Sequence, residues 1–284
     1  MASAAPRVAV VVGGTAGLGR ACALRLAEAN FRVFVVGRDA ERGAAVVADC
    51  VARGGADRGH EFVACDASRI GAVRTCAASI SSRVTNVDAL VLTQGIASMA
   101  GRTETPEGLD VKLSLHYFSR VAFIQALLPS LRAAPAGGRV LSVLSAGVHG
   151  VYAHAVDHFE LKTHFSIKNA ADAAGLYNDL ALDSLAQERD NANVAFVHAA
   201  PGFVATSWGT ELPWAARCLV RGLQTFAKPA DEAGDVLVRS LLAAPLGKLS
   251  LVDPKGGAAP RTRDHDALRE GVWKRTLELL GRIK

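Results

Sequence analysis

The sequence predicts one α/β domain built on a single doubly wound parallel sheet with helices on both faces. Short apolar runs alternate with segments of helical periodicity along most of the 284 residues, as such a sheet requires. A glycine-rich turn at 13–19 joins the first apolar run to the first helical segment. Since 50% of the chain is hydrophobic and no linker, repeat or low-complexity stretch divides it, one domain over residues 1–284 is expected.

The first expected element is a buried strand at 8–12, where the sequence VAVVV is short, apolar and β-branched. The turn GGTAGLG follows, and a helix begins near Ala21. Glycines suit this turn because they accept positive φ and place no side chain between the backbone and a pyrophosphate. The first N–H groups of the helix and its dipole then favour phosphate. We therefore predict a dinucleotide-binding loop, with an ordinary loop as the alternative; its residues are Gly13, Thr15, Gly17, Leu18 and Gly19.

The second expected strand, at 31–36, ends at the position that distinguishes the two nicotinamide dinucleotides. An acidic side chain there would hold the ribose 2′-hydroxyl of NAD, but the chain has Gly37. Arg38 can instead pair with a 2′-phosphate, which favours NADP(H) over NAD(H). The alternative is a surface arginine before a helix that is capped by Asp39.

The remaining segments continue the alternation of strands and helices. Further strands are expected at 61–65, 89–93, 139–144, 193–197 and 248–252, and helices at 108–131 and 170–188. Residues 264–284 form an amphipathic pattern, with Leu268, Val272 and Leu279 on one side and charges opposite. We expect this C-terminal helix to dock onto the domain or onto a second subunit, rather than onto a membrane surface.

Charge and cysteine content exclude several classes of protein. The net charge of +5 is scattered, without a basic run interleaved with aromatic residues, so a nucleic-acid partner is not expected. Five cysteines without a C-x-x-C pair indicate reduced thiols and no metal site. They are Cys22, Cys50, Cys65, Cys76 and Cys218. Neither an export signal nor a membrane-spanning apolar stretch is recognised, so the expected location is cytoplasmic.

The turn at 13–19 after an apolar strand resembles the short-chain dehydrogenase/reductase superfamily, and further matches follow in the same order over roughly residues 6–252. The resemblance implies a Rossmann fold with a nicotinamide cofactor. Asp66 stands where family members hydrogen-bond adenine, and PGFVAT at 201–206 is similar to the Pro-Gly-xxx-Thr segment whose Thr contacts the nicotinamide amide. The cofactor residues implied in this way are Asp66, Gly95, Pro201, Gly202 and Thr206.

The catalytic half departs from the family pattern. Members carry a Ser after the fifth strand, a supporting Asn on the preceding helix, and a Tyr-xxx-Lys pair on the following helix. Ser145 aligns with the substrate-binding Ser, and His116 falls at the position of the supporting Asn. Aligning the segment 184–188 puts Ala171 at the Tyr position and Gly175 at the Lys position. In ordinary members the Tyr protonates the developing alkoxide, while the Lys lowers its pKa and binds ribose, so both reduction and cofactor binding should be weakened.

Other residues could replace the missing pair. Lys168 would share one helical stripe with Ala171 and Gly175 if the helix begins early enough. The sequence HFSIK at 164–168 also repeats the missing spacing, with His164 in place of Tyr. The alternative is that His164 and Lys168 lie on a solvated loop. Further candidates are His116, His149 and His154, each of which taken alone is more often structural, whereas Tyr177 is expected to be a packing residue.

The resulting hypothesis is an NADP(H)-dependent oxidoreductase that reduces a carbonyl or oxidises an alcohol on a small apolar substrate. Ser145 would orient the substrate, and His116 or Lys168 would handle the proton. Residues 203–228 could form a lid over the substrate, with ordinary packing as the alternative. Two other functions stay open: a catalytically silent NADPH sensor or scaffold, and a non-redox lyase or isomerase. Family analogy implies a homo-oligomer, although a fold does not determine function.

Overall fold

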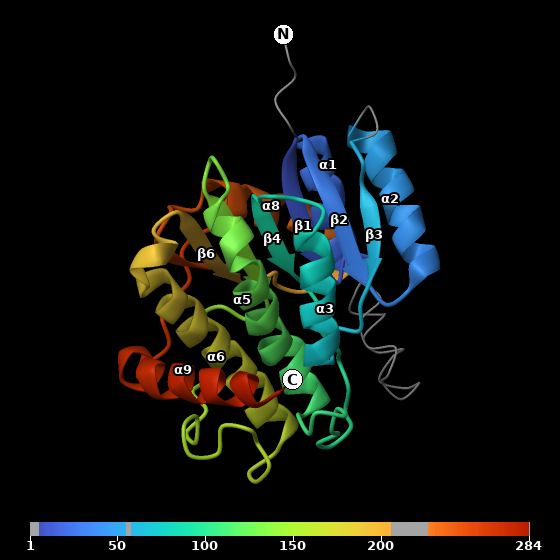
Figure 1. Ribbon diagram of the computed structural model, residues 1–284. Coiled ribbons are helices and arrows are strands. Elements are labelled where there is room, and N and C mark those ends of the chain that lie inside the picture. The colour runs from blue at the N-terminus through green and yellow to red at the C-terminus, as the bar shows by residue number, and fades with distance from the viewer. Residues whose placement is uncertain (1–5, 55–57, 206–226, 284) are drawn as a thin grey trace.

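Seven parallel strands form one sheet in the order β3-β2-β1-β4-β5-β6-β9 in the computed structural model (Figure 1). The structure describes residues 6–54, 58–205 and 227–283. The strands are β1 (Arg7–Val12), β2 (Phe31–Gly37), β3 (Glu61–Ala64), β4 (Ala89–Leu92), β5 (Gly138–Val143), β6 (Val194–Ala199) and β9 (Leu249–Val252). The predicted fold class is confirmed, and each predicted strand is present with its ends shifted by at most two residues.

Helices cover both faces of the sheet, which explains the nearly continuous apolar sequence of the central strands. One face carries α1 (Gly17–Glu28), α2 (Ala40–Gly54) and α8 (Ala230–Ala243). The other carries α3 (Ile70–Ser81), α5 (Ser119–Arg132) and α6 (Ile167–Gln187) (Figure 1). Alternate residues of β1 enter the two cores, Val10 on the α3 side and Val11 on the α1 side. Each strand therefore contributes side chains to both layers.

The strand order reverses between β1 and β4, and this reversal positions the site. The chain runs outward from β1 through β2 to β3, then returns to place β4 beside β1. The loops after β1 and β4 therefore leave the sheet toward opposite faces. Ligands of open α/β sheets bind in the crevice that this divergence opens at the carboxyl ends of the strands.

The helix predicted at 108–131 is divided into three parts. A short α4 (Val111–Leu113) is capped by Asp110, whose carboxylate accepts from the backbone N–H groups of Lys112 and Leu113. A π-helical turn η1 (Ser114–Phe118) then leads into α5. Such turns are frequent at functional sites, and this one carries His116.

The C-terminal helix α9 (His265–Arg282) packs against α6, as the prediction of docking onto the domain requires (Figure 1). Val272 and Leu280 are buried in the core. Asp183 of α6 accepts hydrogen bonds from His265 (3.0 Å) and Arg269 (3.0 Å) of α9. Burial alone would raise the pKa of Asp183, but these partners lower it to about 2.

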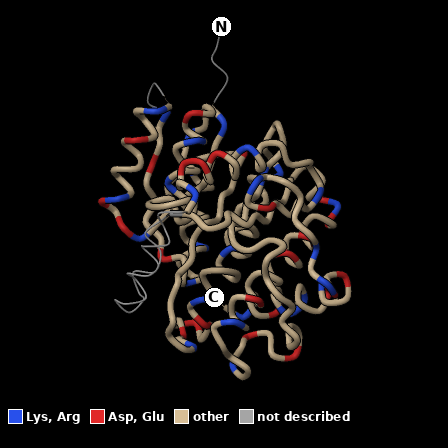
Figure 2. The backbone as a smooth tube through the Cα atoms, turned by 180° about the vertical axis from the view of Figure 1, so that it is seen from behind, with Lys and Arg blue, Asp and Glu red and all other residues tan. Residues whose placement is uncertain are grey.

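The smaller elements complete the chain. A 3₁₀ turn η2 (Arg189–Asn191) precedes β6, and a two-stranded parallel ladder joins β7 (Val204–Ala205) to β8 (Lys228–Pro229). Most of the predicted lid at 203–228 lies outside the described residues. Among the helices that are described, none combines the length and the apolar character needed to cross a bilayer. Figure 2 shows Lys and Arg interspersed with Asp and Glu along the chain.

Candidate cofactor and active site

The glycine-rich loop is fixed by its own backbone. The N–H groups of Gly13 and Gly14 both donate to Val36 O, at 2.9 and 3.1 Å, which joins the loop to the end of β2. Gly13 has φ +78, and a Cβ on Gly19 would stand 2.2 Å from Gly13 O. Substitution at either position would therefore distort the loop.

Helix α1 begins inside this loop with unsatisfied N–H groups. Its N-cap Ala16 supplies no side-chain hydrogen bond, and its first turn has no acidic residue. The first N–H groups are thus available to an anion. Thr15 packs over the end of β2, where a Cβ on Gly37 would lie 2.6 Å from its Cγ2, and Leu18 packs against the core beneath.

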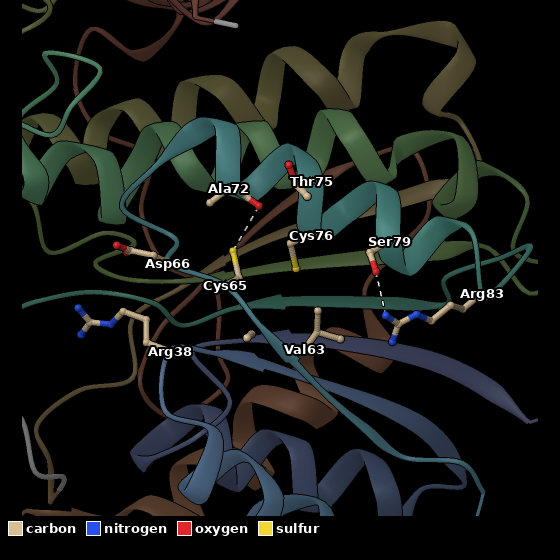
Figure 3. A pocket seen from close by; sticks show the side chains of 10 residues that line it. Arg38, Val63, Cys65, Asp66, Ala72, Thr75, Cys76, Ser79 and Arg83 are labelled. Carbon is tan, nitrogen blue, oxygen red and sulfur yellow. Dashed lines mark hydrogen bonds between the residues drawn. The ribbon is translucent and has the colours of Figure 1, made fainter.

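A cavity of about 720 Å³ lies between helix α3 and the end of β3 with the residues that follow it, and Arg38 after β2 also lines it (Figure 3). Arg38 and Asp66 lie together at one end of it (Figure 3). Asp66 Oδ1 accepts from the N–H (3.0 Å) and the hydroxyl (2.8 Å) of Ser68, which orients the carboxylate. The guanidinium of Arg38 makes neither a hydrogen bond nor an ion pair with the described residues.

The neighbouring acid, Asp39, does not neutralise Arg38. It caps α2 by accepting from Arg42 N (2.9 Å), as the alternative of a surface arginine before a capped helix also expects, and pairs with the Arg42 side chain (2.7 Å). The backbone hydrogen bond from Arg42 lowers the pKa of Asp39. Arg38 thus presents a positive charge at the position where a 2′-phosphate is expected.

His116 holds the backbone after β4. Its Nε2 accepts from Ile96 N at 3.0 Å, and a Cβ on Gly95 would lie 2.7 Å from the same nitrogen, so Gly95 makes room for the ring. Burial, with smaller contributions from Arg120 and Lys112, lowers the pKa of His116 to about 3. The ring is therefore neutral near pH 7. Proton handling by His116 stays a prediction, which this geometry does not favour.

A buried polar network behind His116 was not predicted. Asn178 Nδ2 donates to His116 O (2.8 Å), and its Oδ1 accepts from Ser142 Oγ (2.7 Å). The guanidinium of Arg120, 1% exposed, donates to Ser142 Oγ, Val143 O and Gln94 O. These bonds join the ends of β4 and β5 to the π-helical turn. An arginine within the apolar pattern of α5 was the only sequence signal for them.

Ser145 follows β5 directly, and its backbone N–H donates to His198 Nε2 at 3.1 Å. Its Oγ is buried and has no hydrogen-bond partner in the part of the chain that the structure describes. A Cβ on Gly175 would stand 2.5 Å from Ser145 Oγ and 2.6 Å from His149 Cβ. The space that a lysine would need at Gly175 is thus filled by Ser145 and His149.

Asp179, one helical turn after Gly175, bridges two histidines. Its Oδ2 is 3.0 Å from His149 Nε2, and its Oδ1 is 2.5 Å from His198 Nδ1. The side chains of all three residues are at most 1% exposed. Burial alone would raise the pKa of Asp179, but the two histidines hold it well below its usual range. His149 was one of four histidine candidates in the sequence, whereas no signal there indicated Asp179 or His198.

Lys168 lies within α6, which begins early enough to include it in the predicted stripe. Its ammonium pairs with Asp172 (2.5 Å), and its side chain is 79% exposed. A proton-handling role for Lys168 stays a prediction. The ion pair with Asp172 leaves its ammonium less available for that role.

His164 and Tyr177 lie away from the centre of the site. His164 is exposed on the loop before α6 and stacks on His154, with 4.4 Å between ring centroids. Tyr177 is buried, with its hydroxyl donating to Ala155 O (3.1 Å), so it is a packing residue as predicted.

The predicted residues meet along one edge of the sheet, because parallel strands all end there. The loop at 13–19 follows β1, Arg38 follows β2, Asp66 follows β3, Gly95 follows β4, Ser145 follows β5, and Pro201 and Gly202 follow β6. Gly202 has φ +75, which suits glycine. Thr206 lies outside the described residues. The edge can therefore hold an extended ligand with its phosphates at the amino end of α1 and its other end near Ser145.

Comparisons with known proteins show the family and the fold. Residues 7–156 match the family described as short chain dehydrogenase. Oxidoreductase AN1596 of Emericella nidulans is 32% identical over 70% of this chain, which spans 59% of that relative's length. Polyprenol dehydrogenase of Mus musculus is 30% identical over 97% of this chain and 84% of its own. A metagenomic short-chain oxidoreductase in complex with NADP has the same fold, with TM-score 0.61 and 23% identity over 87% of this chain and 96% of its own.

Proposed function

Because this chain belongs to the short-chain dehydrogenase family, we propose that it is an NADP(H)-dependent oxidoreductase that reduces a carbonyl or oxidises an alcohol on a small apolar substrate. The observation that carries the cofactor proposal is the guanidinium of Arg38, which has no hydrogen-bond or ion-pair partner among the described residues and lies near Asp66 at the carboxyl ends of β2 and β3. A 2′-phosphate needs such a cation, whereas NAD needs an acid at the Gly37 position.

The residues of the sheet edge fit this cofactor. Gly13 and Gly19 leave the backbone close to a pyrophosphate, and the uncapped start of α1 supplies N–H donors to it. Asp66 would accept from the adenine amino group. When bound, NADPH supplies a hydride to a carbonyl carbon. Ser145, whose buried Oγ has no partner among the described residues, would donate to the carbonyl oxygen and orient it.

The name of one relative supports the substrate class. A polyprenol dehydrogenase is similar to this chain over 97% of its length, which favours an apolar alcohol or its carbonyl product.

Fluorescence titration with NADPH and with NADH tests the cofactor proposal. Replacing Arg38 by Ala should weaken NADPH binding by roughly 10- to 100-fold, since hydrogen bonds to charged groups contribute about 1.5–3 kcal/mol. NADH binding should not change. The matched control is Arg42→Ala, because Arg42 is already paired with Asp39. Equal affinity of the unaltered protein for NADPH and NADH would contradict the proposal.

A second function, a catalytically silent NADPH-binding protein, is favoured by one observation. Ala171 and Gly175 occupy the positions of the Tyr and Lys that ordinary members use for proton transfer. Tight NADPH binding without consumption of NADPH by any aldehyde, ketone or quinone would support this sensor or scaffold role.

A further inference from the structure

A cluster of polar side chains consists of Ser145, His149, Asp179 and His198, and the last three are titratable and almost fully buried. It lies where the family places its proton donor, yet it lacks the tyrosine and the lysine. Two observations draw attention to this cluster. Ser145 Oγ is buried without a hydrogen-bond partner in the described chain, and two imidazoles share the buried carboxylate of Asp179.

His198 carries its single proton on Nδ1. Its Nε2 accepts from the backbone N–H of Ser145, so the proton must be on the other nitrogen, which faces Asp179 Oδ1. Burial lowers the pKa of His198. A neutral His198 therefore holds both the Ser145 backbone and one oxygen of Asp179.

His149 lies between two acceptors. Its Nε2 faces the second oxygen of Asp179, and its Nδ1 faces Gly150 O at 3.2 Å. Both nitrogens are best satisfied when both carry protons, which is the imidazolium form.

The charges around His149 favour this form. Burial alone would lower the pKa of His149, but Asp179, with Gly150 O and Asp172, raises it above its ordinary value. His198 stacks on the ring at 6.3 Å and is neutral, and Thr262 Oγ1 lies 3.3 Å from Nε2. Asp172 itself is paired with the exposed ammonium of Lys168.

Gly175 brings the histidine and the serine together. Ser145 Oγ and His149 Cγ both lie within 2.6 Å of the point where a Cβ at Gly175 would stand, so at most about 5 Å separates the two atoms. A lysine at this position would displace both.

Building on the proposed function, we propose that Ser145 and His149 form a proton-transfer chain that replaces the missing tyrosine and lysine, with Asp179 as the residue that positions His149. In the reducing direction, the carbonyl carbon accepts the hydride and the carbonyl oxygen takes the proton of Ser145 Oγ. For His149 to return a proton to Ser145 Oγ, its Nδ1 must exchange the 3.2 Å hydrogen bond to Gly150 O for one to the unpartnered Ser145 Oγ, while Nε2 keeps its 3.0 Å bond to Asp179. Neutral His149 is reprotonated from solvent, Asp179 stays ionised, and alcohol oxidation reverses these steps.

The test is the pH dependence of NADPH oxidation with an activated 1,2-dicarbonyl, phenanthrenequinone, in the intact protein. The rate should fall as pH rises through the pKa of His149, because the acid form supplies the proton. His149→Gln should lower the rate by about 10²- to 10⁴-fold and remove this pH dependence. Asp179→Asn should move the fall to lower pH by about one unit or more, because the carboxylate that raises the pKa is lost.

His158→Gln is the matched control, since His158 lies on the same segment and bonds to Thr163 instead. It should leave both the rate and the pH profile unchanged. NADPH affinity, measured by fluorescence, should be the same in all variants.

Two failures are distinguishable. If the pH profile of turnover is the same in the unaltered protein, in His149→Gln and in Asp179→Asn, the proton-transfer chain is wrong, and the proposed function still stands. An unaltered protein that binds NADPH but reduces no dicarbonyl would overturn the proposed function and the chain with it. If His149→Gln fails to fold, imidazole ¹⁵N spectra of the unaltered protein decide: a His149 that titrates below an ordinary histidine, or a His198 protonated on Nε2, contradicts the proposal.

Discussion

Replacing Gly175 by Ala should separate activity from cofactor binding. The new Cβ would stand 2.5 Å from Ser145 Oγ and 2.6 Å from His149 Cβ, where ordinary contacts are 3.4–4 Å. Ser145 or His149 must therefore move by about 1 Å, and a displacement of that size in a reacting group can cost about 100-fold in rate. The glycine-rich loop lies after a different strand, so NADPH affinity should not change.

The effect of this substitution on stability should be small. Overpacking a core costs about 1–3 kcal/mol, whereas Ala is favoured over Gly inside a helix by about 1 kcal/mol. The two terms nearly offset each other, so the free energy of unfolding should fall by roughly 0–2 kcal/mol. Thermal unfolding would measure this change, and NADPH oxidation with phenanthrenequinone would measure the rate.

Gly281→Ala in α9 is the control, because nothing lies within 4 Å of a Cβ there. It should leave the rate unchanged and keep or slightly raise stability. If Gly175→Ala retains the full rate, then the close approach of Ser145 and His149 is not needed for turnover, and the reasoning is refuted.

Two further predictions concern the cofactor loop and the C-terminal helix. Gly19→Ala should abolish NADPH binding in a fluorescence titration. Its Cβ would stand 2.2 Å from Gly13 O, a backbone atom that cannot move aside. Retained affinity would show that the loop rearranges. Asp183, with its pKa lowered from 3.8 to about 2, contributes stability that is present above pH 4 and is lost as pH falls toward 2. Chemical unfolding across this range should show that loss, on the order of 1–2 kcal/mol, and Asp183→Asn should be less stable at neutral pH and lack that part of the pH dependence.

The order of elements and the cofactor end of the site could be predicted from the sequence. The signals for them are local patterns: strand and helix periodicity, the glycines at 13–19 and the position of Arg38 after the second strand. Hydrogen bonding within one element follows from such patterns. Ser145 was predicted from the resemblance to the family, because it aligns with the substrate-binding Ser after the fifth strand. These residues reach one edge since every parallel strand ends there.

The tertiary structure decided the rest. Asp179 is 30 residues from His149 and 19 from His198, and no local spacing indicates that α6 brings its carboxylate between the two rings. The charge states of these groups also follow from tertiary packing, because burial and the neighbouring charges determine which protonated form is stable. The absence of a Tyr-xxx-Lys sequence could be read from the sequence alone, but only the packing around Gly175 shows that Ser145 and His149 fill the space beside this glycine.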